Sequence, residues 1–213
     1  MVLSVWRDQL IAVIDYGAGN LRSVVNAIAR VGYEAHVTSD ADTIRSADVV
    51  VLPGVGAAGD TMNSLVELGI EKVIHEVVSS GRPFLAICIG LQVLFSATEE
   101  GGWHECLGIL PGTVVRLPDG LKVPHMGWNQ LEQKISHPIF DGIPDGTNFY
   151  FVHSYHGVPE DKSVIAATTE YGVSVCAMAI KDNVVATQFH PEKSGEYGLK
   201  MYANYLKTVL GGR

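Results

Sequence analysis

One of the three cysteines occupies a position suited to nucleophilic chemistry. Cys88 follows the apolar run 83–87 and precedes residues with helical spacing, which places it at a strand-to-helix turn. Ala86 and Gly90 are small, so the chain has room to double back on either side of the thiol. The free N–H groups at the start of a helix favour a thiolate and are donors for an oxyanion. The alternative is that Cys88 is a small buried core residue.

His190 and Glu192 have the spacing of a general base and the carboxylate that orients it. They follow the apolar run 184–188, and residues two apart in an extended chain point to the same side. A carboxylate beside an imidazole accepts its N–H and stabilises the imidazolium. Because the carboxyl ends of parallel strands share one edge of a sheet, we expect Cys88 and His190 to meet there. The alternative is that His190 is an ordinary loop histidine; a metal ligand is disfavoured, because no second His or Cys has suitable spacing.

A glycine-rich loop follows a third apolar strand, with the sequence Pro-Gly-Val-Gly-Ala-Ala-Gly at 53–59. It contains the GxGxxG pattern of dinucleotide-binding proteins. The next strand, however, ends at Cys88 and not at an acidic residue that would hold a ribose. We therefore assign Gly54–Gly56 to a loop whose backbone N–H groups face the thiol and receive an oxyanion. A non-catalytic dinucleotide-binding module is the alternative from a different functional class.

The elements that must hold these groups alternate between strand and helix in the first half of the chain. Strands are expected at 11–15, 34–38, 48–52 and 83–87. Helices are expected at 21–31 and 57–80, the second with a break at Gly69. Continuous apolar strands separated by helices predict an α/β fold whose parallel sheet is covered on both faces.

The second half of the chain has a different pattern. Short strands and turns from 112 to 188 predict an antiparallel extension of the same sheet, with hairpin signals at 117–120 and 181–183. A final amphipathic helix is expected at about 195–210. We expect one domain over 11–213, preceded by an N-terminal extension at 1–10.

Composition excludes several classes of protein. Hydrophobic residues make up 47% and charged residues 18% of the chain, which argues against disorder. The net charge of -8 argues against broad binding to nucleic acid or to acidic membranes. The nearly apolar run 84–95 is too short to span a bilayer, and the first residues lack the layout of a signal peptide. Few cysteines and no CxxC predict neither a disulfide framework nor a zinc site, and indicate a reducing, cytoplasmic location.

Three motifs together resemble those of the class I (triad) glutamine amidotransferases. They are Pro-Gly-Val-Gly at 53–56, Ala-Ile-Cys-Ile-Gly-Leu-Gln at 86–92 and His-Pro-Glu at 190–192. Within that family, the stretches 12–23, 123–129 and 150–155 are similar to the glutaminase subunits of imidazole glycerol phosphate synthases. The resemblance runs from about residue 11 to the C-terminus. Ala86 departs from it, since the family generally has glycine there, and we expect a tighter turn as the result.

The resemblance implies a flavodoxin-like three-layer fold with a central, mostly parallel sheet. It also implies hydrolysis of glutamine to glutamate and ammonia, with no cofactor and no metal. By the family's pattern Cys88 attacks the side-chain amide, His190 moves the proton and Glu192 orients His190.

The same resemblance implies the groups that surround the substrate. The oxyanion would lie on the N–H of Ile89 and on one from the glycine loop, Gly54, Val55 or Gly56, with Val55 the favoured donor. Gln92 matches the residue that holds the glutamine. Ser154 and Tyr155 match the stretch beside its amino-acid end.

A partner subunit is implied as well. In the family, ammonia passes through a protected channel into a TIM-barrel cyclase that forms a heterodimer with the glutaminase and serves histidine biosynthesis. Trp128, Asn129 and Lys193 match stretches near that interface. Another triad amidotransferase subunit, serving pyridoxal phosphate or anthranilate synthesis, is the related alternative, and the stretches 15–20 and 124–128 count against it.

Overall fold

The computed structural model describes residues 9–17 and 19–211. Most of the expected N-terminal extension, residues 1–8, therefore lies outside the described residues. Leu10 already contacts the sheet: its N–H donates to a carboxylate oxygen of Asp48 at 3.1 Å, and its carbonyl accepts the Asp48 N–H at 2.8 Å.

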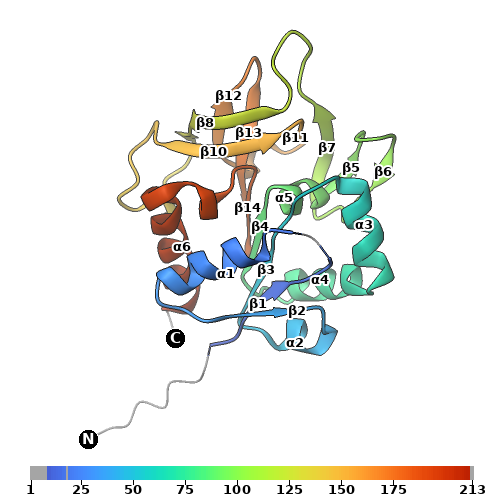
Figure 1. The fold of residues 1–213 in the computed structure, drawn as a ribbon, viewed down its shortest axis with the longest axis vertical. Helices are drawn as coiled ribbons and strands as arrows, with labels where there is room; N and C mark the ends of the chain where they lie inside the picture. The colour runs from blue at the N-terminus through green and yellow to red at the C-terminus, as the bar shows by residue number, and fades with distance from the viewer. Residues whose placement is uncertain (1–8, 18, 212–213) are drawn as a thin grey trace, which may run out of the picture.

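An eight-stranded sheet forms the centre of the molecule, in the order β2-β1-β3-β4-β14-β13-β12-β9 (Figure 1). The first five of these strands are mutually parallel: β2 Ala35–Thr38, β1 Ile11–Ile14, β3 Val49–Leu52, β4 Phe84–Ile87 and β14 Val184–Thr187. This order is the flavodoxin-like one, with the carboxyl ends of β4 and β14 adjacent at one edge. The predicted α/β fold and its parallel sheet are confirmed.

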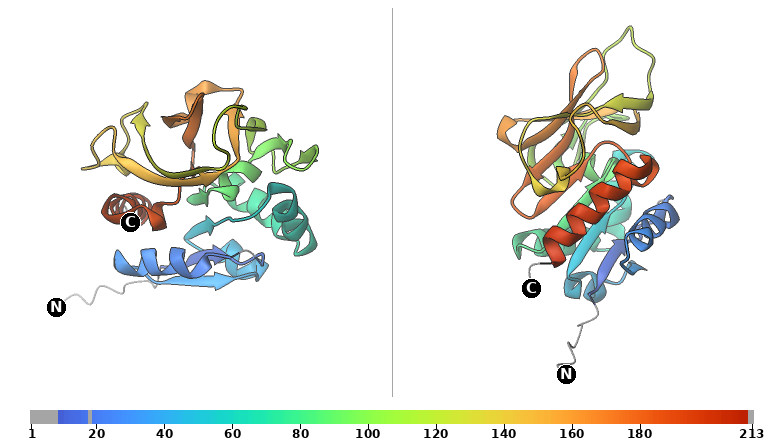
Figure 2. Two further views of the ribbon diagram at one scale, coloured as in Figure 1. Left: turned by 45° about the horizontal axis from the view of Figure 1, so that its top comes forward. Right: turned by 90° about the vertical axis from the view of Figure 1, so that its left-hand side faces the viewer.

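Helices cover both faces of the parallel strands, which explains why four of these strands are buried throughout. Every residue of β1, β3, β4 and β14 is buried. Helices α1 (Leu21–Arg30) and α6 (Gly195–Leu210) lie together on one side (Figure 2). The other side carries α2 (Ala41–Ser46), α3 (Ala58–Glu67) and α4 (Ile70–Ser79).

The expected helical segments were largely correct. The segment 57–80 forms two helices, and Gly69 between them has the left-handed conformation (φ 69°) that glycine adopts readily. The short helix α2 was not expected, because six residues are too few to show a helical period. Asp40 signals its start, since its carboxylate accepts the Thr43 N–H at 2.8 Å. No helix in the described part of the chain is long and apolar enough to cross a membrane.

The second half of the chain only partly extends the central sheet. Strands β13 (Ser174–Lys181), β12 (Ile165–Glu170) and β9 (Glu132–Gln133) do so, antiparallel to their neighbours. Strands β8 (His125–Gln130) and β10 (Asn148–His153) form a separate pair. A third sheet contains β11 (Tyr155–Pro159), β7 (Leu110–Arg116), β5 (Phe95–Thr98) and β6 (His104–Glu105).

One of the two predicted hairpins is wrong. The turn at 117–120 joins β7 to β8, but β7 pairs with β11 and β5, whereas β8 pairs with β10. Turn residues reverse the chain locally, and burial of side chains then decides which strands pair. The hairpin at 181–183 is confirmed, since it joins the antiparallel strands β13 and β14.

Candidate active site

Cys88 lies at a strained turn between β4 and the short helix α5 (Ile89–Val93). Its backbone angles are φ 55° and ψ -105°, a conformation that costs a non-glycine residue about 1–3 kcal/mol. Gly90 is required here, because a Cβ at this position would lie 2.3 Å from the carbonyl oxygen of Leu52. The fully buried Ala86 leaves the turn intact. The predicted sharp strand-to-helix turn around Cys88 is therefore confirmed.

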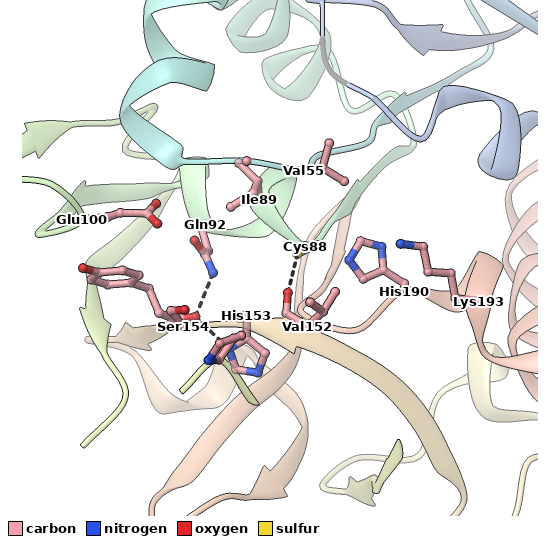
Figure 3. A pocket seen from close by; sticks show the side chains of 13 residues that line it. Val55, Cys88, Ile89, Gln92, Glu100, Val152, His153, Ser154, His190 and Lys193 are labelled. Carbon is pink, nitrogen blue, oxygen red and sulfur yellow. Dashed lines mark hydrogen bonds between the residues drawn. The ribbon is translucent and has the colours of Figure 1, made fainter. Parts of the chain in front are cut away.

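His190 and Glu192 form a buried pair at the neighbouring strand end. His190 Nδ1 lies 2.7 Å from Glu192 Oε1, and both side chains are fully shielded from solvent. The side-chain amide of Asn20 donates to the same carboxylate oxygen at 2.6 Å. Since a carboxylate accepts, Nδ1 carries the imidazole proton and Nε2 is left for the cavity. Figure 3 shows the His190 ring beside Cys88 at that cavity, so the structure brings the two residues together as expected.

The surroundings of His190 favour its charged form. Burial on its own lowers the pKa of an imidazole, but the adjacent Cys88 and the Glu192 carboxylate outweigh burial and raise the pKa of His190 to about 9. At neutral pH the ring is therefore an imidazolium. A cation of this kind beside a thiol favours the thiolate form of the thiol.

The glycine loop lies directly against the nucleophile turn. A Cβ on Gly54 would come within 2.7 Å of both the backbone nitrogen of Gly90 and the Cβ of Ile89, so only glycine permits this approach. Ile89 is the first residue of α5, and the N–H of a first residue has no partner within its helix. This close packing beside Cys88 does not favour a dinucleotide-binding loop.

Tyr16 holds the same loop from the other side. Its hydroxyl donates to the carbonyl oxygen of Pro53 at 3.0 Å. Burial raises the pKa of Tyr16 to about 12, and hydrogen bonds from Thr61 and from the Val55 backbone N–H act in the opposite direction.

A cavity of about 380 Å³ opens in front of Cys88. The expected substrate contacts Gln92, Ser154 and Tyr155 all line it, as do Val55 and Gly56. Gln92 is buried, and its amide nitrogen donates to Tyr155 O at 2.8 Å and to Gln188 Oε1 at 3.1 Å. Its Oε1 is a buried acceptor with no partner among the described residues, available to a ligand.

Three supporting residues were given no role from the sequence. Asn20 lies in the motif stretch 12–23. Its contact with Glu192 spans 172 residues, so no local sequence pattern predicts it. Gln188 donates to the Cys88 sulfur at 3.8 Å. Ser194 donates to His190 O at 2.6 Å and accepts the Tyr150 N–H at 3.0 Å, which fixes the turn carrying His190.

The expected interface residues differ in their surroundings. Trp128 is 58% exposed, and its ring lies edge-on to Tyr150. Lys193 is exposed at the rim of the cavity. Asn129 is half-buried, and its amide donates to the carbonyl oxygen of Glu170 at 2.9 Å.

The other two cysteines have no such surroundings. Burial raises the pKa of Cys106 to about 11 and that of Cys176 to about 12, which keeps both as thiols. All three cysteines are free. Within residues 9–17 and 19–211, no cluster of three His, Cys, Asp or Glu side chains is arranged to hold a metal ion.

Comparison with known families agrees with this fold. The family model described as Glutamine amidotransferase class-I matches residues 12–209. The chain belongs to the class-I glutamine amidotransferase family.

Individual relatives are more specific. The chain is 59% identical to the imidazole glycerol phosphate synthase subunit HisH of Dehalococcoides mccartyi strain CBDB1, covering 96% of this chain and 100% of the relative. It is 53% identical to the subunit of the same name from Chloroflexus aurantiacus, covering 93% of this chain and 95% of the relative.

Solved structures show the same fold at lower identity. A PurLQS structure from Thermotoga maritima matches with a TM-score of 0.75 at 20% identity, over 95% of this chain and 99% of that chain. A structure described as a glutamine amidotransferase matches with a TM-score of 0.74 at 20% identity, over 93% and 98% of the two chains.

Proposed function

We propose that this chain is the glutaminase subunit of an imidazole glycerol phosphate synthase and that Cys88, His190 and Glu192 are its catalytic triad. The observation that carries the proposal is the strained Cys88 turn beside the buried His190–Glu192 pair, at the mouth of one cavity. The 59% and 53% identical relatives, both described as a subunit of that synthase, support the choice of reaction.

In the first half of the reaction the Cys88 sulfur attacks the side-chain amide carbon of glutamine. The carbonyl oxygen becomes an oxyanion, received by the N–H of Ile89 and by one N–H of the glycine loop, which we assign to Val55 between Gly54 and Gly56. His190 then gives its proton to the amide nitrogen, the C–N bond breaks, and ammonia leaves. A γ-glutamyl thioester remains on Cys88.

In the second half the neutral His190 takes a proton from water, and the resulting hydroxide attacks the thioester carbon. The C–S bond breaks, releasing glutamate and the Cys88 thiolate beside a protonated His190. Glu192 accepts a hydrogen bond from the Nδ1–H of His190 throughout, which keeps Nε2 as the proton-transfer atom. Gln92 presents its unpaired Oε1 to the substrate, and Ser154 and Tyr155 bind the amino-acid end.

Ammonia is useful only if it reaches a second active site before it escapes into water. We propose that a TIM-barrel cyclase subunit covers the cavity as the partner in a heterodimer, with Trp128, Asn129 and Lys193 at the contact. Support comes from the exposed Trp128 and from Lys193 at the cavity rim. The free cysteines suit the reducing cytoplasm that we propose as its location.

The proposal is tested by glutamine hydrolysis measured in the presence of a cyclase subunit and its ribotide ligand. Cys88→Ala removes the nucleophile, so hydrolysis should fall to background while complex formation survives. Cys106→Ala is the matched control and should retain full activity. Hydrolysis that persists in Cys88→Ala would assign the nucleophile elsewhere.

Tyr16 provides a separate test of the glycine loop. Because Tyr16 holds the glycine loop through the carbonyl oxygen of Pro53, we expect the isolated chain to be nearly inactive until a partner shifts the loop so that the Val55 N–H faces the cavity. Tyr16→Phe removes the hydrogen bond to Pro53 and should raise the activity of the isolated chain about fivefold, the effect of one net hydrogen bond. Tyr33→Phe, at a half-buried tyrosine on another loop, is the control. A Tyr16→Phe chain no more active than the unsubstituted one would refute this role.

A further inference from the structure

A row of polar side chains crosses the pair of strands β8 and β10, which is drawn above β4 and α5 in Figure 1. His125 on β8 is directly opposite His153 on β10, and both are buried. His125 Nδ1 lies 3.0 Å from His153 Nε2. At the two ends, His153 Nδ1 lies 2.8 Å from Tyr155 O, and the Asn129 amide nitrogen lies 3.3 Å from His125 Nε2. The proposed reaction leaves this row without a role.

Chemistry allows only one placement of the protons in this row. A backbone carbonyl accepts only, so His153 Nδ1 must carry the hydrogen that meets Tyr155 O. Burial lowers the pKa of His153 to about 3 and that of His125 to about 4, so each ring is neutral at pH 7 and has a single N–H. His153 Nε2 is then an acceptor and His125 Nδ1 its donor. His125 Nε2 in turn accepts from the amide of Asn129.

Aromatic rings hold His125 in place, and backbone groups hold Asn129. The His125 ring is stacked on Tyr171 at a centroid separation of 3.9 Å and on Phe151 at 5.0 Å. The Asn129 amide also donates to the Glu170 carbonyl at 2.9 Å, and its oxygen accepts the Gln130 N–H at 2.8 Å. Asn129 therefore cannot turn its oxygen toward His125 without losing both of these bonds.

The far end of the row reaches the nucleophile. Tyr155 O accepts from His153 and also from the Gln92 amide nitrogen, at 2.8 Å in each case. The second N–H of Gln92 goes to Gln188 Oε1 at 3.1 Å, and Gln188 donates to the Cys88 sulfur at 3.8 Å. With both N–H groups engaged, only Oε1 of Gln92 is left for the cavity that this residue lines (Figure 3).

We propose that Asn129, His125 and His153 are positioning residues: through the carbonyl of Tyr155 they hold Gln92 so that its oxygen accepts an N–H of the bound substrate. This inference rests on the proposed function, which supplies glutamine as that substrate. Asn129 lies beside the exposed Trp128, so the row also connects the proposed partner surface with the cavity. A change of hydrogen bonding at Asn129 is then transmitted to the orientation of Gln92.

Asn129→Asp tests the direction of the hydrogen bonds along this row, because aspartate has nearly the same shape as asparagine. A carboxylate cannot donate, so His125 Nε2 must take up the proton, and His125 must then lose its Nδ1 proton or become charged. Nitrogen-15 NMR of the imidazole rings in the full chain reports this directly. We expect Nδ1–H tautomers at His125 and His153 in the unsubstituted protein and a proton on His125 Nε2 in Asn129→Asp. Asn148→Asp, an equal charge change at an exposed position of β10, should leave both rings unchanged.

Glutamine binding provides the second measurement, made calorimetrically in a Cys88→Ala background so that no turnover occurs. Asn129→Asp should raise the Kd about tenfold, the effect of one misdirected hydrogen bond, while Asn148→Asp should not change it. An unchanged Kd in Asn129→Asp overturns the positioning role.

The two measurements also separate this inference from the proposed function. A Cys88→Ala chain that binds no glutamine would refute the proposed function and, with it, the role of Gln92 toward that substrate. The tautomers decide the row of hydrogen bonds independently: an Nε2–H tautomer at His153 in the unsubstituted protein overturns it, even if Asn129→Asp does not fold.

Discussion

The two sites of buried histidine near the cavity have opposite electrostatics. His190 and the His125–His153 pair are all nearly inaccessible to solvent, and burial lowers the pKa of each. The pKa of His190 nevertheless rises to about 9, whereas those of His125 and His153 fall to about 4 and about 3. His190 faces a carboxylate and a thiol, while the pair faces an amide, a carbonyl and each other.

The difference shows that the partner of a buried imidazole, more than its burial, decides whether it carries a charge. A histidine that keeps a proton beside a sulfur can stabilise a thiolate and deliver the proton to a leaving group. A neutral histidine with one donor and one acceptor nitrogen transfers no proton in this way. It instead holds its two hydrogen-bond partners in a fixed orientation. His190 and His153, one of each kind, both line the cavity.

The largest expected effect separates the two histidine sites by their kinetics. His190→Asn removes the proton carrier and should lower kcat for glutamine hydrolysis by about 10³-fold. His125→Asn leaves the triad intact and should mainly raise KM, by about tenfold. Steady-state kinetics of the assembled enzyme distinguish the two. Equal losses of kcat in both variants would remove the proposed division of roles.

The second effect concerns the charge that distinguishes His190. Glu192→Gln keeps a hydrogen-bond acceptor but removes the negative charge, so the pKa of His190 should fall below about 9 and kcat should fall about 10²-fold. In the unsubstituted protein the ring should stay protonated as the pH rises, and lose its proton only near pH 9. NMR titration of the His190 ring measures the midpoint. An equal midpoint in both proteins would mean that the charge of Glu192 does not raise the pKa of His190.

The smallest effect is on stability, and its sign differs between the two sites. The raised pKa of His190 contributes stability below the ordinary pKa of 6.5 that is lost as the pH rises through about 9. His125 and His153 have lowered pKa values, so they reduce stability as the pH falls below 6.5 toward 4. A difference of one bound proton corresponds to about 1.4 kcal/mol per pH unit.

Urea unfolding between pH 7 and pH 4 tests that sign. His125→Gln should flatten the loss of stability with falling pH, relative to the unsubstituted chain. His36→Gln, at an exposed histidine on β2, is the control and should leave the slope unchanged. A slope that His125→Gln does not alter would mean that this ring is not neutral in the fold.

Local signals explain what could be predicted about the fold and the site. The apolar runs at β1, β3 and β4 are long enough to identify buried parallel strands, and small residues around Cys88 indicate a tight turn. His190 and Glu192 are two residues apart, so the sequence indicates that they pair, but the expected extended segment is wrong: Glu192 lies in a 3-10 helix, Pro191–Lys193, that follows His190. The adjacency of β4 and β14 then brings both strand ends together.

Long-range contacts account for most of what could not be predicted. Asn20 reaches Glu192 across 172 residues, and His125 reaches His153 across 28, so no spacing in the sequence connects them. The sheets formed by β8, β10 and β7 depend on which apolar faces meet in three dimensions, and the turn at 117–120 contains no information on that choice. His153 has its partner His125 only because the opposing strand places it there.

The most direct test of the account is covalent labelling by a glutamine-like electrophile, followed by peptide mass spectrometry. We expect one label per chain, at Cys88, with a rate that falls sharply in His190→Asn and changes little in His125→Asn. A label on Cys106 or Cys176, or a Cys88 that reacts equally fast in His190→Asn, would contradict it.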